Sequence, residues 1–255
     1  MCYNARYLLE KALKRAIFYG VSEDIDRFKR ALKKFNELYQ ASGFAHPEVI
    51  IYKNDAPYEP ELAHWGLIPH WVKTEKDAMS IWNKTINARS ETLFEKPAFR
   101  DAAKHKRCLI PVAGFFEHHH FKGKAYPFYI RHINEEPLTL AGIWSEWTNK
   151  STGEIVKTCS VITTKANPLM AKIHNNPKLP EPRMPVILNE KTEDAWLSSS
   201  DIKSLQELLT PSPDNQLHAH PVQKLSGKAA LGNVPESSDT VEYPELEELL
   251  TFLNK

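Results

Sequence analysis

The feature that most constrains the fold is a series of short apolar segments in the middle of the chain, with no helical segment between most of them. Each segment has the length of a strand and is bounded by proline, glycine, asparagine or charged residues. The segments are residues 108–116, 126–133, 138–144, 159–164 and 184–188. A doubly wound parallel sheet needs a helix after each strand, so this succession favours antiparallel pairing. We therefore predict an α+β fold with a mostly antiparallel β core.

Segments with helical periodicity flank this strand-rich middle. Residues 23–41 place apolar side chains at three- and four-residue steps between lysines and arginines, which is typical of an amphipathic helix. Residues 5–18 show a similar pattern, and residues 245–253 indicate a short acidic helix. Residues 210–240 are rich in loops and no second core follows them. We therefore expect a single domain over residues 1–255.

The charge balance excludes two classes of protein. The chain has 33 Lys and Arg against 32 Asp and Glu, a net charge of +1, which excludes a uniformly basic nucleic-acid coat and an acidic disordered chain. Locally, residues 84–107 carry seven basic and three acidic side chains, whereas residues 234–255 carry six acidic side chains and one lysine. The basic cluster suits a phosphate backbone. A solvated face of mixed charge explains the same residues equally well.

The sequence also bears on the cellular compartment. No apolar run approaches the roughly 18 residues of a membrane span, and the N-terminus lacks the continuous apolar core of a secretory signal. The three cysteines, Cys2, Cys108 and Cys159, are too few and too scattered for a disulfide framework or a zinc ribbon. We expect a cytoplasmic protein with reduced thiols, in which Cys108 and Cys159 are structural.

Cys2 is a candidate reactive residue because of its position. If Met1 is removed, Cys2 becomes the N-terminal residue and carries a thiol and an α-amine on adjacent carbons. Reactive fractions of both groups exist near neutral pH. Such a 1,2-aminothiol condenses with an aldehyde, first to an imine and then to a five-membered thiazolidine. The alternative is that Cys2 is an incidental second residue. If Met1 is retained, the amine is blocked and this chemistry fails.

Other polar residues are weak signals when taken singly. Residues 118–120 are three consecutive histidines, but no further ligand lies at metal-binding spacing, so we expect no metal site. Glu117 ends an apolar strand and could act as a general acid or lie on the surface. Asn87 and His174 sit in polar stretches where structural roles are common. The chain also lacks a glycine-rich phosphate loop, a dinucleotide fingerprint, a His-Glu-x-x-His motif and a nucleophile elbow.

The joint occurrence of these residues is far more specific. Eight blocks follow one another in a fixed order: Cys2, WGLIPHW (65–71), NARSET (87–92), RCLIPVAGFFE (107–117), AGIW (141–144), VITTKAN (161–167), His174 and RMPVIL (183–188). This set resembles the SRAP family (SOS response-associated peptidase) from residue 2 to about residue 190. The resemblance implies an α+β fold around a curved, barrel-like β core flanked by helices.

The same resemblance implies a protein that binds single-stranded DNA and crosslinks covalently to abasic sites. Cys2 would be the nucleophile that forms a thiazolidine with the aldehyde of the opened sugar, and Asn87 would orient its amine. Glu117 would act as the acid or base that opens the sugar. His174 would assist formation and reversal of the imine. No cofactor is needed, and we expect a monomer that is cytoplasmic and associates with the nucleoid when bound to DNA.

The resemblance also assigns residues to DNA binding. Arg89 and Arg183 would hold phosphates on either side of the lesion, with Ser90 beside them. Trp65, Pro69 and Trp71 would form an apolar wedge or stacking platform that separates the bases. Phosphate contacts supply affinity without sequence information, which suits a lesion that has no base to read. These residues complete the expected DNA interface.

The chain departs from the family pattern at three places. Cys2-Tyr3-Asn4 replaces the common Cys-Gly-Arg, so the approach to the site is expected to differ in shape. Residues 23–41 enlarge the N-terminal segment. Residues 175–182 form a proline-rich insertion between His174 and Arg183, which leaves the relative placement of those two residues open.

Two further functions compete with crosslinking. In the first, the chain is a thiol peptidase with Cys2 as nucleophile, His174 as base and Asn87 or Glu117 orienting it. Removal of its own leading methionine would be one such activity. In the second, the chain is a non-covalent single-strand binding module in which Cys2 is incidental. Salt would weaken that module smoothly, whereas a covalent adduct would survive salt and denaturant.

Overall fold

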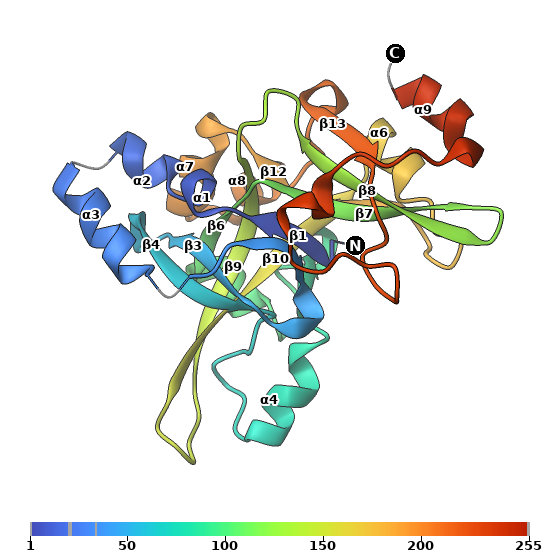
Figure 1. Cartoon of the computed structure of the whole chain (residues 1–255). Coiled ribbons are helices and arrows are strands. Elements are labelled where there is room, and N and C mark those ends of the chain that lie inside the picture. The colour runs from blue at the N-terminus through green and yellow to red at the C-terminus, as the bar shows by residue number, and fades with distance from the viewer. Residues whose placement is uncertain (1, 20–21, 34, 254–255) are drawn as a thin grey trace.

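The computed structural model describes residues 2–19, 22–33 and 35–253. Its centre is a five-stranded closed barrel (Figure 1) formed by β3 (Glu48–Lys53), β4 (Ala56–Trp65), β6 (Arg107–Val112), β9 (Leu138–Thr148) and β10 (Ile155–Lys165). Around the ring, β10 pairs with β4, β4 with β3, β3 with β6, β6 with β9, and β9 again with β10. All these pairings are antiparallel except that of β10 with β4.

Short strands extend the barrel, and a second sheet packs beside it. The strands β5 (Asn87–Arg89) and β11 (Arg183–Pro185) pair with β10, and β12 (Ile187–Leu188) pairs with β9. The second sheet has the order β13 (Leu217–Pro221), β8 (Lys124–His132), β7 (Gly114–Phe121), β1 (Asn4–Tyr7) and β2 (Leu38–Ser42). Its β7–β8 hairpin projects away from the barrel (Figure 1).

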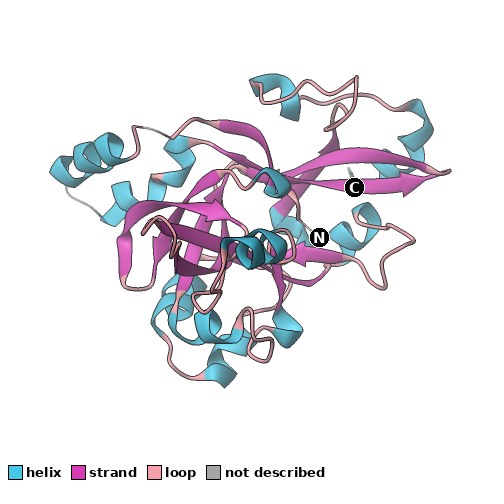
Figure 2. Ribbon diagram, turned by 90° about the horizontal axis from the view of Figure 1, so that it is seen from below, coloured by secondary structure: helices cyan, strands magenta, loops and turns pink. Residues whose placement is uncertain are grey.

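Helices lie around these strands (Figure 2). They are α1 (Leu9–Ala12), α2 (Lys14–Tyr19), α3 (Ser22–Ala31), α4 (Glu75–Trp82), α5 (Arg100–His105), α6 (Pro168–Ile173), α7 (Glu190–Ser198), α8 (Ile202–Glu207) and α9 (Glu247–Leu253). None of the helices in the described part of the chain is long and apolar enough to span a membrane. The predicted α+β fold, with a mostly antiparallel, barrel-like β core flanked by helices, is confirmed.

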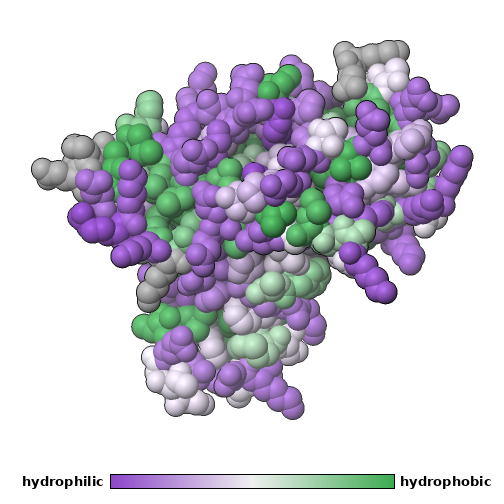
Figure 3. All heavy atoms as spheres, viewed as in Figure 1, coloured by the Kyte–Doolittle hydropathy of each residue, from purple (hydrophilic) through white to green (hydrophobic). Residues whose placement is uncertain are grey.

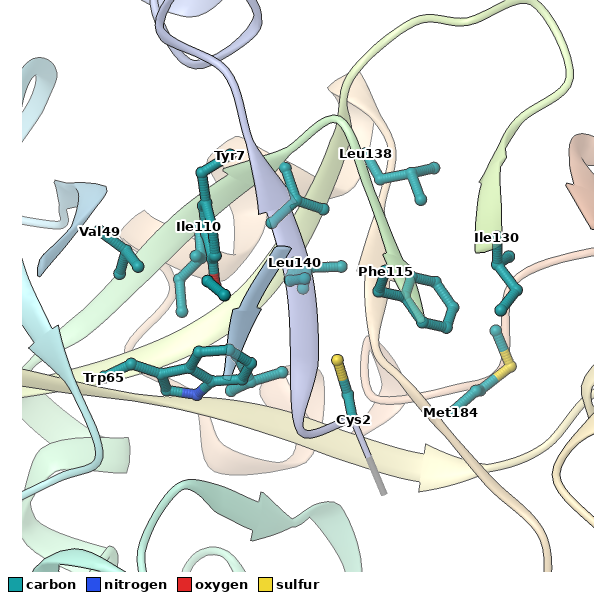
Figure 4. Close-up of a cluster of buried hydrophobic side chains, with 14 of the residues drawn as sticks. Cys2, Tyr7, Val49, Trp65, Ile110, Phe115, Ile130, Leu138, Leu140 and Met184 are labelled. Atoms are coloured by element: carbon teal, nitrogen blue, oxygen red, sulfur yellow. The ribbon is translucent and has the colours of Figure 1, made fainter. Parts of the chain in front are cut away.

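The core has two layers because barrel strands are buried on both faces. On β6, Ile110 points into the cluster that also holds Cys2, Trp65 and Phe115, whereas the neighbouring Leu109 packs into the cluster beneath the surrounding helices. Figure 4 shows the first cluster, with the Cys2 side chain directed into it. Burial on both faces explains why these strands read as continuous apolar runs in the sequence.

Two helix predictions are partly wrong. Of residues 5–18, the first three belong to β1, and the remainder is split between α1 and α2. Of residues 23–41, the helix ends at Ala31, and residues from Leu38 onward form β2. The cause is pairing between distant segments, since β1 lies between β2 and β7. The predicted C-terminal helix is confirmed as a short 3₁₀ turn followed by α9.

The surface is mostly polar on the face seen in Figure 3. An apolar patch at its left edge coincides with the position of α2 in Figure 1, whose side chains Ile17, Phe18 and Tyr19 are exposed. Tyr19 packs against Tyr58 of β4, with ring centroids 4.9 Å apart. This patch precedes residues 23–41, which enlarge the N-terminal segment.

Candidate functional site

Cys2 lies immediately before β1 and is buried in the core. Its thiol is 3.8 Å from the main-chain oxygen of Asn4, to which it donates a weak hydrogen bond. Burial is the larger cause, and the negative charge of Glu117 the smaller one, that together raise the pKa of the Cys2 thiol to about 12. The thiol is therefore protonated at neutral pH.

Asn87 contacts the main chain of Cys2 directly. It stands at the start of β5, which is held in parallel register against Val161 of β10. The Asn87 side-chain Nδ2 donates a hydrogen bond of 2.8 Å to the Cys2 carbonyl oxygen. Its Oδ1 is buried without a hydrogen-bond partner in the described part of the chain, which leaves an acceptor beside Cys2.

Glu117 and His174 form the second half of the site. Glu117 is buried on β7, and its Oε2 lies 3.9 Å from Nδ1 of His174, which follows α6. Its Oε1 accepts a hydrogen bond of 3.1 Å from the main-chain N–H of His118. Burial lowers the pKa of His174, although the charge of Glu117 opposes that shift. The imidazole is therefore neutral near pH 7 and able to accept a proton.

His174 and Arg183 remain adjacent despite the insertion between them. The His174 Nδ1 lies 2.8 Å from the main-chain oxygen of Arg183 and 3.0 Å from its main-chain nitrogen. Residues 175–182 thus leave the site and return to it as a closed loop. The insertion does not separate the two family motifs, which answers the question left open by the sequence.

Arg183 does not occupy the position expected of a phosphate ligand. Its side chain is only 1% exposed, and its guanidinium forms a two-pronged ion pair with Glu91 at 3.0 and 2.8 Å. It also donates hydrogen bonds of 2.8 Å to Glu181 and to the Thr163 carbonyl. Two carboxylates already neutralise this charge, so the predicted phosphate contact does not fit the structure.

The other predicted DNA-binding residues divide into buried and exposed ones. Trp65 is fully buried and donates its indole N–H to the Ile86 carbonyl at 3.0 Å, so it offers no ring face to a base and the predicted stacking role does not fit. Pro69 is also buried, whereas Trp71 is 46% exposed. Trp71 donates to the Pro97 carbonyl at 3.3 Å.

Arg89 and Ser90 lie at the end of β5, where the strand passes into a short 3₁₀ turn, and both are partly exposed. Within the described ranges, the Arg89 guanidinium makes no ion pair or hydrogen bond with another side chain. Burial, followed by the charge of Glu117, raises the pKa of the nearby Tyr3 phenol, and the charge of Arg89 opposes that shift. The charge of Arg89 acts on the Glu91 carboxyl, but unlike Arg183 it forms no ion pair in the described part of the chain.

Tyr3, which follows Cys2, and Phe44 form an aromatic pair that the sequence did not identify. Their ring centroids lie 4.9 Å apart at 33°, and Phe44 is 54% exposed. The main-chain N–H of Gly43 donates to the Tyr3 carbonyl at 2.8 Å, and a Cβ on Gly43 would approach Ile86 to 2.7 Å. This turn is therefore packed firmly against the core. The sequence marks Tyr3 as unusual, because tyrosine replaces the common family glycine there, but no sequence feature singles out Phe44.

The histidine tract does not assemble a metal centre. Within residues 2–19, 22–33 and 35–253, no three His, Cys, Asp or Glu side chains are grouped so that they could hold a metal ion. The His119 ring instead lies 2.8 Å from the Lys172 carbonyl through Nδ1. The tract therefore has structural contacts on β7, next to Glu117.

The fold and this cluster define a known class of protein. Residues 1–229 match the family model described as SOS response associated peptidase (SRAP), and the chain belongs to this family. Among its relatives, the abasic site processing protein YoqW of Bacillus subtilis is 41% identical over 164 residues, which cover 63% of this chain and 68% of YoqW. The abasic site processing protein HMCES of Gallus gallus is 30% identical over 178 residues, covering 62% of this chain and 51% of that protein.

A solved structure supports the fold assignment. The crystal structure of a protein from Bacteroides thetaiotaomicron superposes with a TM-score of 0.81 and 32% sequence identity. The match covers 94% of this chain and 100% of that one. The insertion and the enlarged N-terminal segment therefore sit on a fold that an experimental structure shares.

Proposed function

We propose that this protein processes abasic sites in DNA by forming a covalent link through Cys2. Relatives that share its family carry the name abasic site processing protein. The observation that carries the proposal is the arrangement around Cys2, where Asn87 binds the Cys2 carbonyl and keeps a buried acceptor oxygen that no described residue pairs with. An amine at Cys2, freed by removal of Met1, is the donor that this acceptor suits.

The chemistry balances without a cofactor. Hydrolysis of the Met1–Cys2 peptide bond frees the amine, which adds to the aldehyde of the ring-opened abasic sugar. Loss of one water gives an imine. The thiol then adds to the imine carbon, its proton passes to nitrogen, and the thiazolidine ring closes. Holding amine, thiol and aldehyde together replaces a bimolecular condensation by an effectively unimolecular one.

The remaining groups are arranged for proton transfer. The charge of Glu117 acts on both sides of the site, since it raises the pKa of the Cys2 thiol and opposes the lowering of the His174 pKa by burial. In the proposal Glu117 exchanges a proton with the sugar oxygen as the ring opens, and the neutral His174 accepts one as the imine forms. Both groups are buried, which keeps bulk water away from the imine.

Single-stranded DNA is the proposed partner, bound by a monomer in the cytoplasm. Arg89 and Ser90 are the proposed phosphate contacts, and Trp71 presents an exposed ring on the loop that Pro69 anchors. The Tyr3–Phe44 pair adds an exposed aromatic surface directly beside Cys2. Stacking on aromatic rings tolerates any base, which suits a protein that recognises a missing one.

The thiol peptidase is the weaker candidate on physical grounds. A thiol nucleophile attacks a peptide carbonyl as the thiolate, which requires a lowered pKa. Here burial raises the pKa of Cys2 to about 12. Imine formation begins with the amine instead, and the thiol enters only in the second step, so a protonated thiol is compatible with crosslinking.

The test mixes the protein with a single-stranded oligonucleotide that carries one abasic site and separates the products on a denaturing gel. We expect a shifted band that survives high salt and is absent with an intact oligonucleotide. Cys2→Ala removes the band, whereas Cys108→Ala, which alters another fully buried thiol of the same core, retains it. Salt-sensitive binding without any covalent band would leave the non-covalent module as the function.

A further inference from the structure

The histidine tract and the first residue of the insertion meet beside Glu117. Glu117, His118, His119 and His120 are consecutive on β7. The pairing of β7 with β1 ends at Phe116, so His120 lies beyond the reach of that neighbour. On its other edge this part of β7 pairs with β8; on the edge that β1 has left, it contacts the segment that carries His174.

Asn175 binds His120 as a neighbouring strand would. The main-chain N–H of His120 donates to Asn175 Oδ1 at 2.6 Å, and Asn175 Nδ2 donates to the His120 carbonyl at 2.9 Å. Both main-chain groups of one residue are thereby satisfied by a single side-chain amide, which carries an NH₂ donor group and a carbonyl acceptor in fixed geometry. Asn175 is the residue directly after His174.

A second contact joins the same two segments. The buried His119 ring lies 2.8 Å from the Lys172 carbonyl, at the end of α6. The two contacts join β7 to α6 on one side of His174 and to the insertion on the other. His174 is therefore held between two anchors to the strand that carries Glu117.

We propose that Asn175 and His119 are positioning residues that set the separation between His174 and Glu117, and that this is what the start of the insertion contributes. The inference rests on the proposed crosslinking function. The 3.9 Å between Glu117 Oε2 and His174 Nδ1 depends on where their two segments lie, in addition to the contacts that the two side chains make with His118 and Arg183. Loosening the anchors alters that separation without removing a group that touches DNA.

The test measures the crosslinking rate at saturating abasic DNA, and separately the affinity for the same DNA in a Cys2→Ala background. Asn175→Ala and His119→Ala are each expected to slow crosslinking about tenfold, since displacing reacting groups by about 1 Å can cost up to about a hundredfold. The affinity stays unchanged. His119→Gln keeps a donor toward the Lys172 carbonyl and recovers part of the rate.

Asn176→Ala is the matched control. Asn176 belongs to the same insertion, but its side chain accepts a hydrogen bond from Lys178 within the loop, so its replacement leaves the rate unchanged. Wild-type rates in both Asn175→Ala and His119→Ala would overturn the inference, as would a loss confined to affinity. If the wild-type protein itself forms no adduct, the proposed function fails and the positioning role fails with it.

Discussion

Replacement of Arg183 decides between a structural and a DNA-binding role for this arginine. Arg183→Met keeps most of the side-chain volume but removes the guanidinium that pairs with Glu91 and Glu181. Breaking a buried ion pair costs about 3–5 kcal/mol because the partner charge is left uncompensated. Here the Glu91 and Glu181 side chains are 39% and 36% exposed, so water compensates in part.

We therefore expect a loss of about 2 kcal/mol in the free energy of unfolding. In a chain of this size that corresponds to a fall in Tm of about 4–8 °C. Urea denaturation measures the first quantity and a thermal scan the second. The variant Glu91→Gln in the Arg183→Met background removes one unpaired charge and should recover part of the stability.

DNA binding supplies the contrasting readout. A lost phosphate contact lowers the slope of log affinity against log salt by about 0.7 on a single strand. Because Arg183 is enclosed by carboxylates, we expect an unchanged slope in Arg183→Met and a reduced one in Arg89→Met. A reduced slope in Arg183→Met with unchanged stability would refute this reasoning and restore Arg183 as a phosphate ligand.

Three other predictions follow from the site. Phe44→Ala is expected to weaken binding of single-stranded DNA by about 5- to 100-fold in fluorescence anisotropy. The control is Phe18→Ala, which removes an exposed aromatic ring on α2 and leaves the affinity unchanged. Equal affinities of Phe44→Ala and the wild type would exclude stacking on Phe44. Burial lowers the pKa of His174 and His119 from 6.5, so the unfolded state binds protons first and stability is lost as pH falls below about 6.5. A urea midpoint at pH 5.5 equal to that at pH 7.5 would contradict this. In the free protein, the raised pKa of Cys2 makes its alkylation by iodoacetamide at pH 8 much slower than that of a free thiol, and rapid labelling would show a thiolate.

The barrel could be predicted from the sequence because its strands are buried on both faces and stand out as apolar runs. The sequence nevertheless predicts a single strand over residues 108–116, whereas the structure divides this segment between β6 and β7 at Ala113. The secondary structure of segments 5–18 and 23–41 is harder to predict from the sequence. Their local periodicity favours helices, but the pairing of β1 with β2 and β7 outweighs it in both.

The site was accessible only through the motifs. Cys2, Asn87, Glu117 and His174 are far apart in the sequence, and no local pattern indicates that Asn87 reaches the Cys2 carbonyl or that Glu117 faces His174. A motif also does not reveal burial. For that reason the motif predicts Trp65 on a stacking surface, although this residue belongs to the core.

The measurement that tests the central claim most directly is the intact mass of the purified adduct between this protein and an abasic oligonucleotide. The account predicts the mass of the chain without Met1 plus that of the DNA, less one water. It also predicts a Cys2 that no longer reacts with a thiol reagent after denaturation. An adduct that retains Met1, or one in which Cys2 is still a free thiol, would contradict the account, because the link would then join the DNA through another residue.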